Sequence, residues 1–187
     1  MHEAQLRDSG SGLAPVTDGW FVVNARDAEW WFANSRGARC SFDNEYGEPA
    51  VEFPELGINI TVLEQGQTTV YHAESSQEAF LVLSGECRLL VEGEERVLRP
   101  WDFFHSPPWT ENAFVGAGEG PCVILMAGAR GPATQSEEGQ VRYPVSELAA
   151  RYGASVEVET SDPAQAYATA EWFRRERPSY WFRLPWA

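Results

Sequence analysis

The chain has 187 residues, of which 43% are hydrophobic and 13% aromatic, as is typical of a globular protein with one domain and a substantial core. Its formal net charge of −14 at pH 7 disfavours nucleic acid and anionic membranes as partners, because both would repel it. None of the fourteen basic residues is a lysine, which excludes Schiff-base chemistry on a lysine amine.

Targeting and redox features are sparse. No apolar run approaches the ~20 residues that span a bilayer, and the first residues lack the pattern of a signal peptide, so we expect a soluble, cytoplasmic protein. The cysteines, Cys40, Cys87 and Cys122, are far apart and form no CxxC pair. A zinc ribbon or a disulfide framework is therefore not indicated, and we expect reduced, structural thiols.

The first third of the chain is irregular. Residues 1–17 are polar and rich in glycine and serine, and we expect them to form a mobile leader. A short strand is expected at 21–24, and the aromatic residues 30–32 that follow are of a kind that covers a barrel end or a subunit interface. Residues 43–57 contain two prolines and two glycines, which predicts a loop.

Short strands separated by turns follow. Ile58, Ile60 and Val62 alternate with polar residues, the period-two pattern of a half-buried strand. Gly93 permits a tight hairpin between two later strands. The remaining strand-like segments cover residues 78–84, 87–91, 96–98, 111–115 and 121–128. This pattern predicts an all-β fold, an antiparallel sandwich or jelly roll.

The sequence changes character after residue 130. A short helix is expected over 144–152, and a second from the Asp162-Pro163 cap to about Arg175. We therefore divide the chain into the leader, a barrel with N-terminal strands over 18–130, and a C-terminal extension over 131–187 with one or two helices. The aromatic, arginine-rich end of this extension is expected to form an arm over a partner subunit.

Two histidines and two glutamates are spaced so that they can meet. His72 and Glu74 are two residues apart, so on a strand their side chains leave the same face. Glu78 opens the next strand after a polar turn, and His105 lies in a later aromatic strand. Imidazole nitrogens and carboxylate oxygens together suit a divalent ion of iron, manganese, zinc, nickel or cobalt. An alternative stays open: a surface His72–Glu74 ion pair, a solvated Glu78 and a core histidine at 105.

Strand parity also names residues beside these candidate ligands. Phe80 and Val82 share a face with Glu78, and Phe103 shares a face with His105. They predict a small, largely apolar substrate pocket. Tyr71 has the opposite parity from His72, so we expect it outside the barrel.

The spacing around the first histidine resembles the first cupin motif, GxxxxxHxHxxxExxxxxxG. It is matched by Gly66, His72, Glu78 and Gly85, with Glu74 where the family usually has its second histidine. The second motif, GxxxxxPxGxxHxxxN, is matched more loosely. Gly93, Pro100 and His105 match it, with one residue inserted before Pro100. Asp102 stands where the motif has its second glycine, and Trp109 stands where it has asparagine. The resemblance covers roughly residues 55–130.

The resemblance implies a double-stranded β-helix with a metal at its centre, bound by His72, Glu74, Glu78 and His105, in a protein that pairs as a homodimer. Trp109 and Asn112 would then lie at the pocket mouth. The implied function is a metal-dependent enzyme, for which an oxygenase is one candidate, acting on a small organic molecule. Glu74 would be a fourth ligand or a general base. The alternative is a non-catalytic cupin that binds or senses a small molecule.

Overall fold

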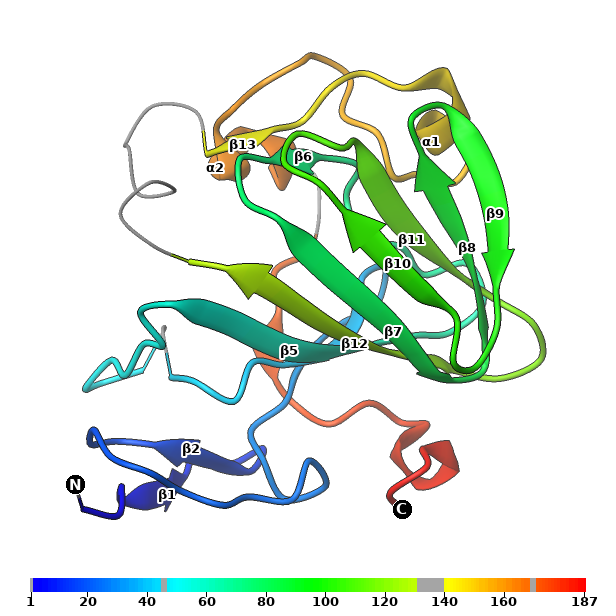
Figure 1. Cartoon of the computed structure of the whole chain (residues 1–187). Helices are drawn as coiled ribbons and strands as arrows, with labels where there is room; N and C mark the ends of the chain where they lie inside the picture. The colour runs from blue at the N-terminus through cyan, green and yellow to red at the C-terminus, as the bar shows by residue number, and fades with distance from the viewer. Residues whose placement is uncertain (1, 45–46, 131–139, 169–170) are drawn as a thin grey trace.

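The structure, a computed structural model, describes residues 2–44, 47–130, 140–168 and 171–187. Strands dominate it, and the all-β prediction is confirmed (Figure 1). The strands are β1 Leu6–Asp8, β2 Leu13–Pro15, β3 Trp31–Ala33, β4 Gly37–Cys40, β5 Leu56–Leu63, β6 Ala73–Glu74, β7 Glu78–Ser84, β8 Glu86–Val91, β9 Glu94–Leu98, β10 Phe103–Ser106, β11 Asn112–Ala117, β12 Cys122–Ala129, β13 Val141–Arg142 and β14 Arg174–Arg175. The helical elements are α1 Glu147–Ala150, α2 Pro163–Ala166 and a 3-10 turn at Trp181–Arg183.

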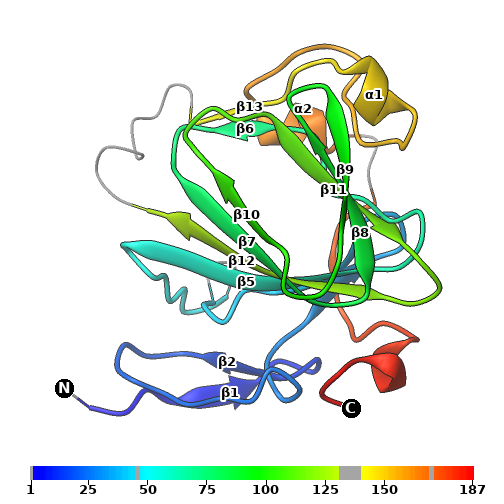
Figure 2. The same cartoon turned by 45° about the vertical axis from the view of Figure 1, so that its right-hand side comes forward.

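Two antiparallel sheets face each other and form the barrel (Figure 2). The larger sheet has the strand order β10-β7-β12-β5-β4-β3-β14, and the smaller has the order β11-β8-β9. Backbone bridges from Thr68 to Val115 and from His72 to Asn112 add the segment before β6 to the free side of β11. The short pair β6 and β13 lies at one end of the barrel (Figures 1 and 2).

Alternation along the strands builds the barrel interior. In β7 the side chains of Phe80 and Val82 point inward, where they pack with Leu89 of β8, Phe114 of β11 and Ile124 of β12. Side chains from both sheets interdigitate in this way because successive residues of a strand point to opposite faces. The interior is therefore a packed apolar core below the end that carries β6.

The outer faces of both sheets are covered as well. On the larger sheet, Trp30 is completely buried, and its ring centroid lies 5.3 Å from that of Trp181 and 5.2 Å from that of Trp186. The end of the chain thus packs on this chain's own barrel. On the smaller sheet, Tyr71 packs with Ala149 of helix α1. Tyr71 lies outside the barrel, as its parity predicts, but under the C-terminal extension rather than in solvent.

Two expectations for the ends of the chain differ from the structure. Residues 2–17 contain the hairpin of β1 and β2 instead of an irregular leader, and Ala14 and Val16 are buried. The second expected helix is the single turn α2, because Tyr167 leaves helical geometry at φ −102° and ψ 7°. Residues 174–175 instead pair with β3 as an edge strand, and residues 169–170 of the expected helix lie outside the described part.

No strand forms at residues 21–24, where the sequence predicts one. Within the described ranges, no helix is long and apolar enough to cross a bilayer.

Candidate metal centre

His72 is fixed by its backbone and by one ring nitrogen. Its N–H donates to the carbonyl of Asn112 over 3.1 Å, and its carbonyl accepts from the N–H of Asn112 over 2.8 Å. Nδ1 of the imidazole lies 2.8 Å from the carbonyl oxygen of Val70, which can only accept, so we assign the ring proton to Nδ1. Nε2 of the neutral ring then carries a lone pair, and a backbone carbonyl behind Nδ1 is the usual way to orient a metal-binding imidazole.

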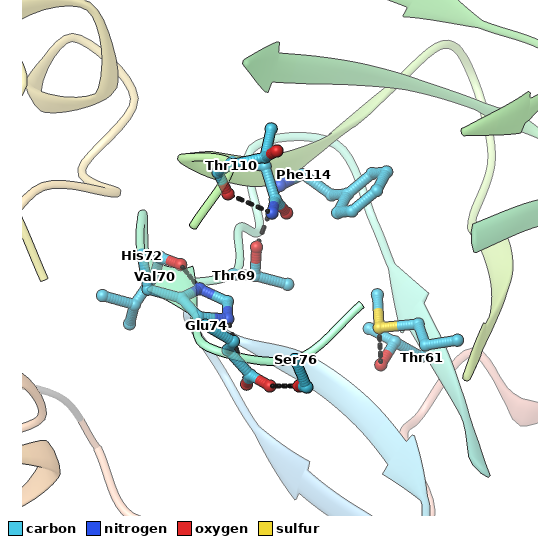
Figure 3. Close-up of polar contacts among 10 residues, drawn as sticks. Thr61, Thr69, Val70, His72, Glu74, Ser76, Thr110 and Phe114 are labelled. Atoms are coloured by element: carbon cyan, nitrogen blue, oxygen red, sulfur yellow. Dashed lines mark hydrogen bonds and ion pairs between the residues drawn. The ribbon is translucent and has the colours of Figure 1, made fainter. Parts of the chain in front are cut away.

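Glu74 presents its carboxylate to that nitrogen. Its Oε1 lies 3.5 Å from Nε2 of His72, and its Oε2 accepts a hydrogen bond of 3.2 Å from the Ser76 hydroxyl (Figure 3). The backbone of Glu74 is fixed on both sides, because β6 pairs with β13 and the Glu74 carbonyl accepts from the N–H of Trp109 over 2.6 Å. Glu74 is the more accessible of the two, since 38% of its side chain is exposed against 20% for His72.

Glu78 completes the group from the first position of β7. It has the inward parity of Phe80 and Val82, at the end of the strand nearest β6. The side-chain amide of Asn112 donates to its carboxylate and also donates to the carbonyl of Thr110 over 3.2 Å. One ligand atom from each of His72, Glu74 and Glu78 can be chosen so that all lie within 4.8 Å of one another.

The three groups shift one another's proton affinities. Burial works against the charged imidazole, but the hydrogen bond and charge of Glu74 outweigh it and raise the pKa of His72. Burial likewise works against the charged carboxylate of Glu74, yet His72 and Ser76 lower its pKa overall. Burial and the charge of Glu74 raise the pKa of Glu78 to about 7, against weaker opposition from His72 and Asn112. In the metal-free protein these shifts favour the protonated form of His72 and the ionised form of Glu74, and they bring the Glu78 carboxyl close to its titration midpoint at neutral pH.

This donor set fits a divalent metal ion. Two carboxylates neutralise a dication, and one imidazole with its rear nitrogen bonded to a carbonyl suits a first-row metal. The carboxylates lie close to each other in a half-buried place, which raises the free energy of the ionised state unless a cation is present. Three protein ligands also leave coordination positions for water or a substrate. A His72, Glu74 and Glu78 group that could hold a metal is thus present in the structure.

His105 does not join this group. In β10, Phe104 lies opposite Phe80 and packs in the interior, with ring centroids 5.5 Å apart. The next residue must point to the other face, so His105 lies opposite Ala79 and is exposed. The spacing of the second motif predicts His105 as a ligand. In the structure, the face of β10 that points into the barrel carries Phe104 instead.

The predicted pocket residues divide in the same way. Phe80, Val82 and Asn112 are buried and face the interior, although contact with a substrate stays a prediction for all of them. Phe103 shares the outer face with His105 and is 63% exposed, so the structure corrects its expected place in the pocket. Trp109 is 44% exposed and lines an open groove outside β6 and β13, together with Val141, Arg142, Glu159, Thr160 and Ser161.

Sequence reasoning missed Ser76 and Arg39. Ser76 is one of the turn residues between the strands, and its place two residues after Glu74 is the signal that could have suggested a hydrogen bond. Arg39 comes from β4, far earlier in the chain, and its charge lowers the pKa of Glu74. Only the pairing of β4 with β5 brings it near the group, so no local pattern could have revealed it.

Comparisons with known proteins agree with this architecture. The family model of the cupin domain matches residues 59–128. Together with the antiparallel two-sheet barrel, this match shows that residues 59–128 form a cupin domain with the double-stranded β-helix fold. A comparison with curated proteins found no match.

Solved structures resemble the barrel at low identity. An RmlC-like cupin from Shewanella frigidimarina is 17% identical, with a TM-score of 0.50 over 64% of this chain and 95% of that one. The polyketide cyclase RemF from Streptomyces resistomycificus is 14% identical, with a TM-score of 0.50 over 59% and 80%. A putative sugar phosphate isomerase from Acidithiobacillus ferrooxidans is 28% identical, with a TM-score of 0.43 over 50% of this chain and 60% of that one. The likenesses to the RmlC-like cupin and to RemF concern the fold alone.

Proposed function

We propose that His72, Glu74 and Glu78 bind a divalent metal ion and that the protein is a metal-dependent enzyme acting on a small organic molecule. The observation that supports this most is the convergence of one imidazole and two carboxylates within 4.8 Å at the end of the barrel that carries β6. The group is half-buried, so a small molecule can reach it from solvent. Its position, at one end of a packed apolar core, is where ligand sites of small barrels are expected.

The ligand types narrow the choice of metal. Carboxylate oxygens favour manganese and other hard ions, whereas imidazole suits iron, zinc, nickel and cobalt as well. We therefore expect one ion of this set, with manganese favoured by the two carboxylates. A bound ion of this kind would supply a Lewis acid that polarises a carbonyl or hydroxyl oxygen of the substrate.

The side chains around the ion divide into positioning and proton-transfer roles. Nδ1 of His72, bonded to the Val70 carbonyl, orients Nε2 toward the ion. The Ser76 hydroxyl fixes Oε2 of Glu74, which leaves Oε1 toward the site. Glu74 is the carboxylate that pairs with His72, and 38% of its side chain is exposed, so we assign it the role of general base when it is not needed as a ligand.

A reaction without net oxidation has better support than an oxygenase. Non-haem iron oxygenases use two histidines and one carboxylate with open positions. In the described part of the chain the group contains a single histidine, since His105 points away from it. An oxygenase would require iron and dioxygen on a one-histidine, two-carboxylate set.

One observation favours a non-catalytic alternative. Without a metal, the raised pKa of His72 and the lowered pKa of Glu74 favour an ion pair between them, and the raised pKa of Glu78 favours its neutral form, so the group can exist without a cation. Such a group is stable as a hydrogen-bonded site, and it could bind or sense a small molecule without turning it over.

Elemental analysis of protein purified without a chelating tag tests the proposal. We expect about one equivalent of a single first-row divalent ion per chain, removed by a chelator and restored by the same ion. Dioxygen uptake with iron loaded, and isomerisation or elimination of hydroxy- and keto-acid substrates with manganese loaded, then separate the two reaction classes. A protein that takes up none of the five ions at micromolar concentration contradicts the metal proposal and favours the non-catalytic alternative.

A further inference from the structure

Arg39 projects from the larger sheet into the same side of the barrel as the metal ligands. In β4 its neighbours Ala38 and Cys40 are buried in the cluster on the outer face of the sheet. Arg39 therefore points to the inner face, where it pairs in register with Thr61. Thr61 is itself an inner residue, with its hydroxyl 3.5 Å from the sulfur of Met126 (Figure 3).

The guanidinium of Arg39 lacks the partner that such a group normally has. Its Nε is buried and has no hydrogen bond, and among the described residues no carboxylate forms an ion pair with it. Elsewhere on the chain the arginines commonly pair, as Arg142 does with Glu111 and Arg130 with Asp43. A buried donor without an acceptor is costly, and a guanidinium has five donors in a fixed planar fork. The position therefore favours an acceptor that arrives with a ligand.

Arg39 is close to the metal ligands without being their counter-ion. Burial raises the pKa of Tyr167, a tyrosine at the end of helix α2, and the charge of Arg39 opposes this; the same charge adds to the stronger effects of His72 and Ser76 that lower the pKa of Glu74. The ring of Tyr167 packs on Tyr143, and the ring of Tyr143 lies 5.9 Å from His72. Glu74 makes its contacts with His72 and Ser76 instead. Ring contacts through Tyr143 therefore link Tyr167 to His72, and the charge of Arg39 acts on both Glu74 and Tyr167.

We propose that Arg39 binds an anionic group of the substrate, a carboxylate or a phosphate, while another part of the same molecule reaches the group formed by His72, Glu74 and Glu78. The placement of the reacting end at the metal ligands rests on the proposed function. Binding of the anion by Arg39 requires no metal. A guanidinium can bond both anions through two parallel hydrogen bonds. The Tyr167 hydroxyl supplies a further donor. In a protein with net charge −14, and beside two glutamates, an acidic molecule would be repelled unless a cation received it.

Binding of small anions to metal-free protein tests the proposal. After chelation and dialysis, inorganic phosphate and malonate are titrated calorimetrically into wild type, Arg39→Gln, Arg39→Lys and the control Arg96→Gln. Arg96 is an exposed arginine that pairs with Glu94, so Arg96→Gln reproduces the change in net charge of Arg39→Gln without a change at the proposed site. We expect the affinity for at least one anion to fall by about tenfold or more in Arg39→Gln, to fall less in Arg39→Lys, and to stay unchanged in Arg96→Gln. The anion that binds more tightly to wild type identifies the substrate class.

Two results would overturn the assignment: wild type binds neither anion, or Arg39→Gln binds both as tightly as wild type does. Arg39→Lys keeps the positive charge, and its binding decides the matter if Arg39→Gln does not fold. Tyr167→Phe provides a second check, with an expected loss of about threefold. The metal content of each variant is measured separately. Anion binding that depends on Arg39 in a protein without metal affinity would refute the proposed function but not this inference.

Discussion

Nε2 of His72 faces Oε1 of Glu74 at 3.5 Å, while Nδ1 of the same ring is bonded to the carbonyl of Val70 at 2.8 Å. One ring nitrogen is therefore hydrogen-bonded to the backbone, and the other can coordinate an ion, as a metal-binding imidazole requires. The same distance would also accommodate a protonated imidazole that simply pairs with the carboxylate. Substitutions at the histidines distinguish the two.

Replacing His72 by alanine is predicted to abolish metal binding. The ion would lose its nitrogen ligand and the side chain that orients Glu74, so the affinity should fall by more than about 100-fold. His105→Ala is the matched control, because His105 is exposed on the opposite face of β10 and should leave the affinity unchanged. Competition with a metal-sensitive dye measures both. Equal losses in the two variants would mean that His105 reaches the ion, contrary to its position.

Glu74 and Ser76 are predicted to contribute in graded steps. Glu74→Ala removes a ligand that is more exposed than His72 and should lower, but not abolish, metal content. Ser76→Ala removes only the hydrogen bond to Oε2 and should weaken metal affinity by about tenfold. The two values are obtained by the same dye competition. A Ser76→Ala variant as weak as Glu74→Ala would mean that the hydroxyl acts on the ion directly.

The metal-free protein is predicted to lose stability as the pH rises through neutrality. The pKa of Glu78 is about 7 in the folded chain against an ordinary value of 4.5, so the folded state binds its proton more tightly than the unfolded state does. The stabilisation from this group is complete below pH 4.5 and disappears as the pH rises through 7. Glu78→Gln stays neutral throughout, so wild type should lose stability relative to this variant between pH 5 and pH 8.

Thermal unfolding of chelated protein at several pH values measures this difference. Glu74 and His72 titrate in both proteins, but the charge of Glu78 also raises the pKa of His72, so the difference measures Glu78 together with its interaction with His72. Adding the metal should reverse the trend for wild type, because the ion then replaces the proton on Glu78. Parallel curves for wild type and Glu78→Gln would contradict the raised pKa.

The sequence predicts the fold and the grouping of three of the four expected ligands for identifiable reasons. Alternation in 58–62 and 78–84 and the turn residues between strands are local signals, and they define the barrel strands without tertiary information. The group of His72, Glu74 and Glu78 is also local, because His72 directly precedes β6, Glu74 ends β6, and Glu78 opens β7 after one turn. These parts need no knowledge of long-range pairing.

The predictions that were wrong concern features that depend on packing between distant parts of the chain. Which face of β10 points inward is decided by Phe104 packing on Phe80 and Phe114, and the alternating aromatic residues at 103 and 104 leave both choices open in the sequence. The hairpin at residues 6–15 and the edge strand at 174–175 form against other parts of the structure, since their own sequences have weak strand signals. Arg39 reaches the site only through the pairing of β4 with β5.

Two phenylalanines provide a direct test of the inward and outward faces. Phe114 is 1% exposed and its ring lies 4.9 Å from that of Phe80, so Phe114→Ala should destabilise the fold by about 3–5 kcal/mol through lost burial and a cavity. Phe103→Ala makes the same chemical change on the exposed face and should alter the free energy of unfolding by about 0.5 kcal/mol or less. Urea denaturation measures both. A large loss in Phe103→Ala would show that the outer face of β10 is covered in solution, as it would be in a dimer through this edge of the sheet.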